Sequence, residues 1–153
     1  MQVNKFDIQI VNPVLRKLNE RIGEFEPELF LERRKILAGV DLQEAQDVIR
    51  IVTANHGNAY LIPVAYRESS VTMEEAKKIA LKEYENLKVK FPLLDPLQEG
   101  YDDYLWWSFK AEDPDAIDRG IIPGVITIAV DKLSGEVRNR EAHQKWLQLQ
   151  RGN

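Results

Sequence analysis

The clearest periodic pattern of apolar and polar positions predicts an amphipathic helix over residues 72–90. The segment Thr72-Met73-Glu74-Glu75 has the form of a capping box, in which threonine and glutamate satisfy the first backbone N–H groups of a helix. The dipeptide Phe91-Pro92 predicts the end of the helix, because proline disfavours helical backbone in the residue before it. A single apolar stripe at helical spacing contains Ala76, Ile79, Ala80, Tyr84 and Leu87.

Two later segments, roughly 104–111 and 122–131, alternate between apolar and polar positions as strands do. The turn Lys132-Leu133-Ser134-Gly135 after them predicts a glycine in the left-handed region that carries the chain into Val137. We therefore expect an α+β fold in which the helix packs on a small antiparallel sheet. The inward positions, expected to be nearly fully buried, are Trp107, Phe109, Ile126, Ile128, Ile79 and Ala80.

Residues 1–68 predict a mainly helical region that precedes the α+β domain of residues 69–153. Asn12-Pro13 resembles a helix start, and a second helix is expected to open at Pro27 and to end at Gly39. Residues 6–11 alternate briefly, which fits either a strand or the lead-in to a helix.

Two further elements are predicted between residues 41 and 66. Asp41-Leu42-Gln43-Glu44 has capping-box form and favours a helix behind it, although the β-branched run Val48 to Thr53 leaves a hairpin as the alternative. Residues 59–66 are typical of a strand, and Pro63 predicts an edge position or a bulge because proline cannot donate to a ladder. A short C-terminal helix is expected, and it should place Trp146 on the core.

The composition is that of a globular protein: 153 residues, of which 44% are hydrophobic and 30% charged. No apolar run approaches the roughly 20 residues that cross a bilayer, and no signal peptide follows Met1. The absence of cysteine excludes disulfides and thiolate chemistry, and it favours a cytoplasmic location.

Candidate catalytic chemistry is sparse. The two histidines, His56 in a turn and His143 on a helix face, have no nucleophile motif beside them. Glycine-rich phosphate loops and zinc-protease motifs are absent from the sequence. Basic residues form no stripe, so nucleic acid is not an expected partner. We therefore expect a non-enzymatic protein without cofactor or resident metal.

The strongest signal for binding is the acidic stretch 99–118, with seven acidic residues against the single Lys110, a local net charge of −6. A solvated acidic loop is one interpretation, and a face that attracts a basic protein is the other. Aromatic residues beside the stretch favour binding, since tyrosine and tryptophan anchor interfaces. The predicted partner-binding residues are Asp102, Asp103, Tyr104, Trp106, Glu112, Asp113, Asp115 and Asp118.

Alternative functions remain open from the sequence. The run Asp113-Pro114-Asp115-Ala116-Ile117-Asp118 offers carboxylates for a divalent cation, as in a hydrolase, but its spacing departs from a calcium-binding loop. A capped turn leading into a short helix explains the same residues. A structural or oligomerisation module, for example a homodimer, is a third hypothesis.

The order of motifs across residues 70–139 resembles PepSY-type and cystatin-like α+β domains, which include immunity proteins of bacterial toxin systems. The resemblance lies in Val71-Thr72-Met73-Glu74-Glu75-Ala76, then Trp107-x-Phe109, and finally Val130-Asp131-Lys132-x-Ser134-Gly135-Glu136-Val137. It implies a non-catalytic domain that binds and blocks another protein. No catalytic residue carries over from it.

Overall fold

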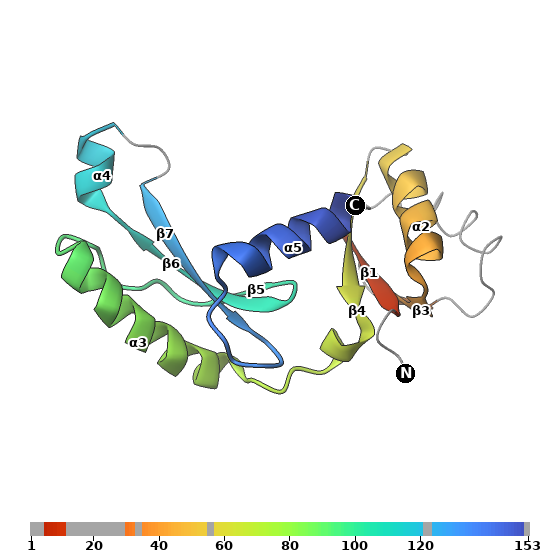
Figure 1. Ribbon diagram of the computed structural model, residues 1–153, viewed down its shortest axis with the longest axis horizontal. Coiled ribbons are helices and arrows are strands. Elements are labelled where there is room, and N and C mark those ends of the chain that lie inside the picture. Colours follow the sequence, from red (N-terminus) through yellow and green to blue (C-terminus); the bar gives the residue numbers. More distant parts are fainter. Residues whose placement is uncertain (1–4, 12–29, 33–34, 55–56, 121–123, 152–153) are drawn as a thin grey trace. The chain divides into compact units, whose positions relative to one another are not determined.

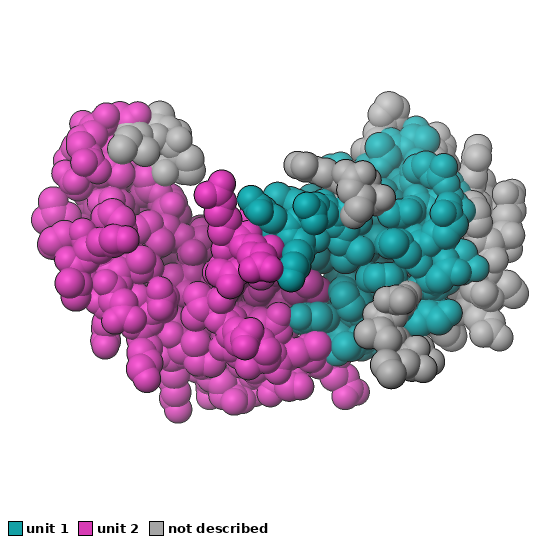
Figure 2. Space-filling view, in the orientation of Figure 1, with its two compact units in different colours: residues 1–67, 144–153 teal, residues 68–143 magenta. Residues whose placement is uncertain are grey.

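The computed structural model describes residues 5–11, 30–32, 35–54, 57–120 and 124–151. The chain forms two compact units: unit 1 contains residues 1–67 and 144–153, and unit 2 contains residues 68–143 (Figure 2). The division after Arg67 lies one residue from the boundary that the sequence suggested. The C-terminal residues 144–153 belong to unit 1, whereas the sequence grouped them with the second region.

Unit 1 is built on an antiparallel sheet with the strand order β2-β3-β1-β4 (Figure 1). The central strand β1 buries Ile8 and Ile10 completely, and these side chains share a core with Val48 and Val52 of helix α2. The elements of this unit are β1 (Phe6–Val11), β2 (Phe30–Glu32), β3 (Lys35–Val40), α2 (Leu42–Ala54), β4 (Asn58–Pro63), the 3-10 turn η1 (Val64–Arg67) and most of α5 (Arg140–Arg151).

The expectation of a mainly helical N-terminal region is wrong. Residues 30–32 and 35–40 pair as strands where a helix from Pro27 to Gly39 was predicted, and residues 6–11 are a strand. The helix predicted after Asn12-Pro13 lies outside the described residues. Short apolar segments fit either period, and here pairing with distant strands decided the outcome, as tertiary context commonly does.

The helix and the edge strand predicted for residues 41–66 are both present. Asp41 accepts a hydrogen bond through Oδ1 from the N–H of Glu44 at 2.9 Å and so caps α2. Strand β4 lies at the edge of its sheet and ends at Pro63, where the missing N–H costs no ladder bond. The Gln150 amide accepts from the N–H of Leu61 at 2.6 Å and donates to its carbonyl at 3.1 Å, so a side chain covers the open edge.

Two contacts hold further parts of unit 1 in place. Trp146 of α5 is buried and stacks on Tyr60 with ring centroids 6.3 Å apart, so it lies in unit 1 and not on the core of the second region, where the sequence placed it. The carboxylate of Asp7 is fully buried and accepts hydrogen bonds from the N–H groups of Ala38 and Gly39 at 3.0 and 3.1 Å. Arg67 donates to it at 2.7 and 2.9 Å, and these bonds raise the pKa of Arg67 above its ordinary value, against the opposing effect of partial burial.

Unit 2 has the predicted arrangement of a helix on an antiparallel sheet (Figure 1). Helix α3 begins with the expected capping box: Thr72 Oγ1 accepts from the N–H of Glu75 at 3.1 Å, and Glu75 accepts from the N–H of Thr72 at 3.3 Å. The elements are α3 (Met73–Lys90), β5 (Tyr101–Asp103), β6 (Trp106–Glu112), α4 (Pro114–Asp118) and β7 (Val125–Asp131), with the strand order β5-β6-β7.

The core of unit 2 follows half of the sequence prediction. Phe109 and Ala80 are fully buried and Ile128 nearly so, but Trp107 and Ile126 are only half-buried. Trp107 lies beyond the start of α3, where its Nε1 donates to the carbonyl of Val71 at 2.8 Å, so the helix covers only part of the ring. Ile79 is also only half-buried, whereas Tyr84 and Leu94 join the buried core.

The opposite face of β6 is covered at the end near Trp106. Trp106, Ser108 and Ala129 are all buried there. The guanidinium of Arg138 lies 4.8 Å from the Trp106 ring centroid, and its backbone N–H donates to the carbonyl of Ala129 at 2.7 Å. The segment around Arg138 thus covers this face, and the adjacent Trp106 and Trp107 point to opposite faces of the sheet without either side chain being fully exposed.

The turn after β7 has the predicted geometry. Gly135 has a φ of +74°, and its N–H donates to the carbonyl of Asp131 at 3.0 Å. The Asp131 carboxylate accepts from the N–H groups of Leu133 and Ser134 at 2.8 and 2.9 Å, and Val137 then pairs with Val130.

We expect Phe109→Ala to lower the free energy of unfolding by about 3–5 kcal/mol, because it leaves a cavity in a fully buried site. Urea denaturation measures the change, with Lys110→Ala, an exposed neighbour in the same strand, as the control. A loss below about 1 kcal/mol would contradict the central position of Phe109.

Gly135→Val should lower the free energy of unfolding by about 1–3 kcal/mol, since a β-branched residue is strained at positive φ. Gly135→Asn is the matched control, because asparagine tolerates this conformation best among the non-glycine residues. Equal thermal stability of the two variants would count against the observed turn.

Candidate functional site

The acidic stretch predicted as one binding face is divided between the two ends of β6. Residues 102–104 lie in the β5–β6 hairpin at the start of the strand, and residues 112–118 lie at its end and in α4. A strand rises about 3.3 Å per residue, so Trp106 and Glu112 are separated by about 20 Å. The eight predicted residues therefore form two sites rather than one surface.

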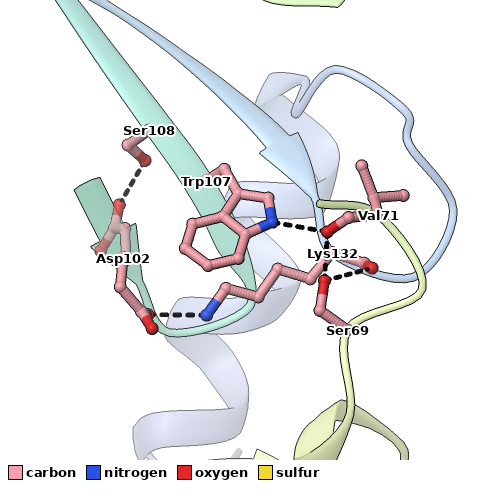
Figure 3. Close-up of polar contacts among 7 residues, drawn as sticks. Ser69, Val71, Asp102, Trp107, Ser108 and Lys132 are labelled. Carbon is pink, nitrogen blue, oxygen red and sulfur yellow. Dashed lines mark hydrogen bonds and ion pairs between the residues drawn. The ribbon is translucent and has the colours of Figure 1, made fainter. Parts of the chain in front are cut away.

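At the hairpin end, Asp102 belongs to a network within unit 2 (Figure 3). Its carboxylate accepts from Lys132 Nζ at 2.6 Å, and the same ammonium lies 4.5 Å from the centroid of the Trp107 ring. Ser69 donates to the carbonyl of Lys132 at 3.1 Å and contacts the carbonyl of Val71, which also accepts from Trp107. These contacts fasten the segment before α3 to the sheet.

The other predicted residues of the hairpin end also have internal roles. Asp103 accepts from Ser108 Oγ at 2.9 Å and lies 3.8 Å from Arg138 Nη1. Trp106 is only 4% exposed, so its ring cannot provide contact area to a partner without a rearrangement. Tyr104 is half-buried, with a φ of +57° in the two-residue loop of the hairpin, a strained conformation for a tyrosine. Lysine and arginine thus compensate both carboxylates at this end.

At the opposite end of β6, the second acidic group borders a pocket of about 240 Å³. Pro92 helps to end α3, and the tight turn that follows places Leu94 N–H on the carbonyl of Phe91 at 3.1 Å. The chain then returns along β6, where Asp95 N–H donates to the carbonyl of Glu112 at 2.8 Å. The pocket lies between this turn and α4, and it is lined by Lys90, Phe91, Pro92, Leu93, Asp113 and Asp115.

The unusual member of the pocket is Asp113, which is only 6% exposed. Both backbone groups of Asp113 form hydrogen bonds: the N–H donates to the carbonyl of Gly124 at 2.7 Å, and the carbonyl accepts from the N–H of Ile117 at 3.1 Å. Its carboxylate, although at the N-cap of α4, makes no capping bond, and the described structure gives it no other hydrogen-bond or ion-pair partner. The Asp113 side-chain oxygens are not fully buried, so the carboxylate keeps a small contact with solvent through which a donor or a cation can reach it.

The rim of the pocket is acidic and apolar. Asp115 has a side chain that is 50% exposed and lies 3.4 Å from Arg119 Nη2. Leu93, which lines the pocket, is 63% exposed, a high value for an aliphatic side chain. Lys90 lines the pocket, yet within the described residues it forms no ion pair with either carboxylate. The predicted residues Glu112 and Asp118 are exposed nearby and add negative charge.

Sequence reasoning missed Lys90, Phe91 and Leu93 as site residues, because it interpreted them only as the end of a helix. The apolar pair Leu93-Leu94 directly after Phe91-Pro92 could have indicated a site here. Only Leu94 is buried in the core, which leaves Leu93 as an exposed apolar residue. The helical turn expected after Asp113 is present as α4, without the aspartate cap.

Within the described residues, no group of three or more histidine, aspartate or glutamate side chains converges in a way that could hold a metal ion. A separate search of the helices in the described ranges found none with the length and apolar character needed to cross a membrane.

We expect Asp113→Asn to raise the free energy of unfolding by about 1 kcal/mol, because a neutral amide loses less hydration than a carboxylate at a position that is 6% exposed and has no side-chain partner in the described structure. The exposed Asp118→Asn in the same helix is the control and should change stability by less than about 0.5 kcal/mol. A clear loss of stability in Asp113→Asn would show that the carboxylate has a partner in solution.

Comparison with protein-family models, with curated proteins and with solved structures found no match to this chain. The architecture and the pocket therefore stand as the basis for inferring function.

Proposed function

We propose that this chain is a non-catalytic protein-binding domain that engages a basic partner through the α4 end of unit 2. The observation that carries the proposal is Asp113, a carboxylate that is 6% exposed, has no partner within the described structure and borders a pocket. A carboxylate with so little exposure is hydrated less well than one on an open surface. A cationic group from a partner would satisfy the charge on binding.

The surroundings of the pocket support a protein partner. Exposed carboxylates at Glu112, Asp115 and Asp118 create a negative field that speeds encounter with a positive surface. Exposed Leu93 supplies apolar area that association would remove from water. Apolar contact area beside charged groups is typical of protein interfaces.

The hairpin end of β6 is the weaker candidate for the interface. Asp102 and Asp103 are already paired with Lys132 and Arg138, and Trp106 is buried. A partner that bound there would have to replace existing ion pairs, with little net gain.

The finer form of the proposal is an immunity-like inhibitor, a domain that covers a basic functional surface of another protein. Its support is the resemblance across residues 70–139 together with the acidic surface around α4, where only Asp115 has an ion-pair neighbour among the described residues. Inhibition by coverage needs no catalytic group in the inhibitor.

The proposal is tested by selecting ligands for the purified protein from a random peptide display library. We expect enrichment of peptides rich in lysine and arginine, with Kd values that weaken as salt is raised. The triple variant Asp113→Asn/Asp115→Asn/Asp118→Asn should bind the selected peptides at least 10-fold more weakly.

A matched control is Glu68→Gln/Glu74→Gln/Glu136→Gln, which removes the same number of charges from exposed positions of unit 2. It should change Kd by less than twofold. Selection of peptides without basic residues, or equal weakening by the two triple variants, would refute binding through the α4 end.

A further inference from the structure

The pocket beside α4 has the size of a receptor for one side chain. Its volume of about 240 Å³ lies below the roughly 300–1,000 Å³ of sites that hold drug-sized ligands. It is lined by the apolar residues Phe91, Pro92 and Leu93 and by the charged residues Lys90, Asp113 and Asp115. A ligand group that suits it must have an apolar stem and a positively charged end.

The two carboxylates differ in their need for a cation. Asp115 is half exposed and already lies 3.4 Å from Arg119, so solvent and a neighbour satisfy it. Asp113 is only 6% exposed, and its side chain has no such neighbour within the described structure. A charge-assisted hydrogen bond to Asp113 would therefore contribute more to binding than one to Asp115.

Arginine fits these walls better than lysine. A guanidinium is planar, weakly hydrated and able to stack on an aromatic ring, whereas an ammonium is compact and strongly hydrated. A half-buried phenylalanine beside a carboxylate favours the group that loses less hydration on entry. We infer that the pocket formed by Phe91, Pro92, Leu93 and Asp113 receives a single arginine side chain of the basic partner, an inference that rests on the proposed function.

Lys90 gives the inference an independent test. This residue also lines the pocket, and it forms no ion pair with Asp113 or Asp115 in the described structure. A positive charge at the wall opposes entry of a guanidinium. Removal of that charge by Lys90→Ala should therefore tighten binding, an effect that a merely structural role of the lysine would not produce.

The experiment titrates the isotopically labelled full chain with n-butylguanidinium, n-butylammonium or the neutral n-butylurea and follows backbone amide chemical shifts. We expect saturable shifts centred on residues 90–94 and 113–115 with n-butylguanidinium. Shifts with n-butylammonium should saturate at several-fold higher concentration, and n-butylurea should give none that saturate.

The variants repeat this titration. Asp113→Asn should weaken n-butylguanidinium binding at least 10-fold, Lys90→Ala should tighten it about threefold, and Glu74→Gln, far along α3, should leave it unchanged. The spectrum of each variant establishes that it is folded. Equal shifts with n-butylurea, tighter binding of n-butylammonium, or retention of affinity in Asp113→Asn would each overturn the inference.

Failure here is distinguishable from failure of the proposed function. Basic peptides that bind through the acidic residues of α4 while n-butylguanidinium does not titrate would retain the function and reject the arginine pocket. Titration of n-butylguanidinium without enrichment of basic peptides would reject the function and assign the pocket to small guanidinium compounds.

Discussion

Helix α3 packs on the β6–β7 pair, with Phe109 fully buried at the centre of the contact. This packing determines where the other elements of unit 2 lie. The contact requires Gly100, where an added Cβ would lie 2.5 Å from the Phe109 ring and 2.6 Å from the sulfur of Met73. Because the chain can pass this closely, it returns from the end of α3 along β6, where the N–H of Gln98 donates to Lys110 at 2.7 Å. That return brings the turn after α3 beside α4 and so creates the pocket.

Two buried aspartates show how similar residues acquire different roles. Asp7 in unit 1 is fully buried and accepts from two backbone N–H groups and twice from Arg67, so its charge is compensated and it joins two strands to the turn η1. Asp113 in unit 2 is almost as buried but has no such partner within the described structure. The first arrangement stabilises the fold. The second leaves a poorly hydrated negative charge that a ligand of opposite charge would compensate.

The division of the acidic stretch also changes the electrostatics of the molecule. A local charge of −6 in sequence becomes two groups separated by about 20 Å along a strand, farther than the Debye length of about 8 Å at physiological salt. The two groups therefore act independently. Lys132 and Arg138 compensate the hairpin group, whereas in the α4 group Arg119 lies near Asp115 and no ion pair reaches Asp113 within the described residues.

The sequence by itself determined the features that depend on neighbours along the chain. The Thr72 capping box, the left-handed Gly135 and the alternation around Phe109 are local, because caps, turns and strand faces are set within a few residues. Only the tertiary structure decided the sheet of unit 1, since short segments such as residues 35–40 become strands by pairing with distant ones. It also decided that Trp106 is buried, that residues 102–104 and 112–118 lie apart, and that Asp113 borders a pocket with Phe91. Burial and charge compensation depend on residues far away in sequence, and no local pattern encodes them.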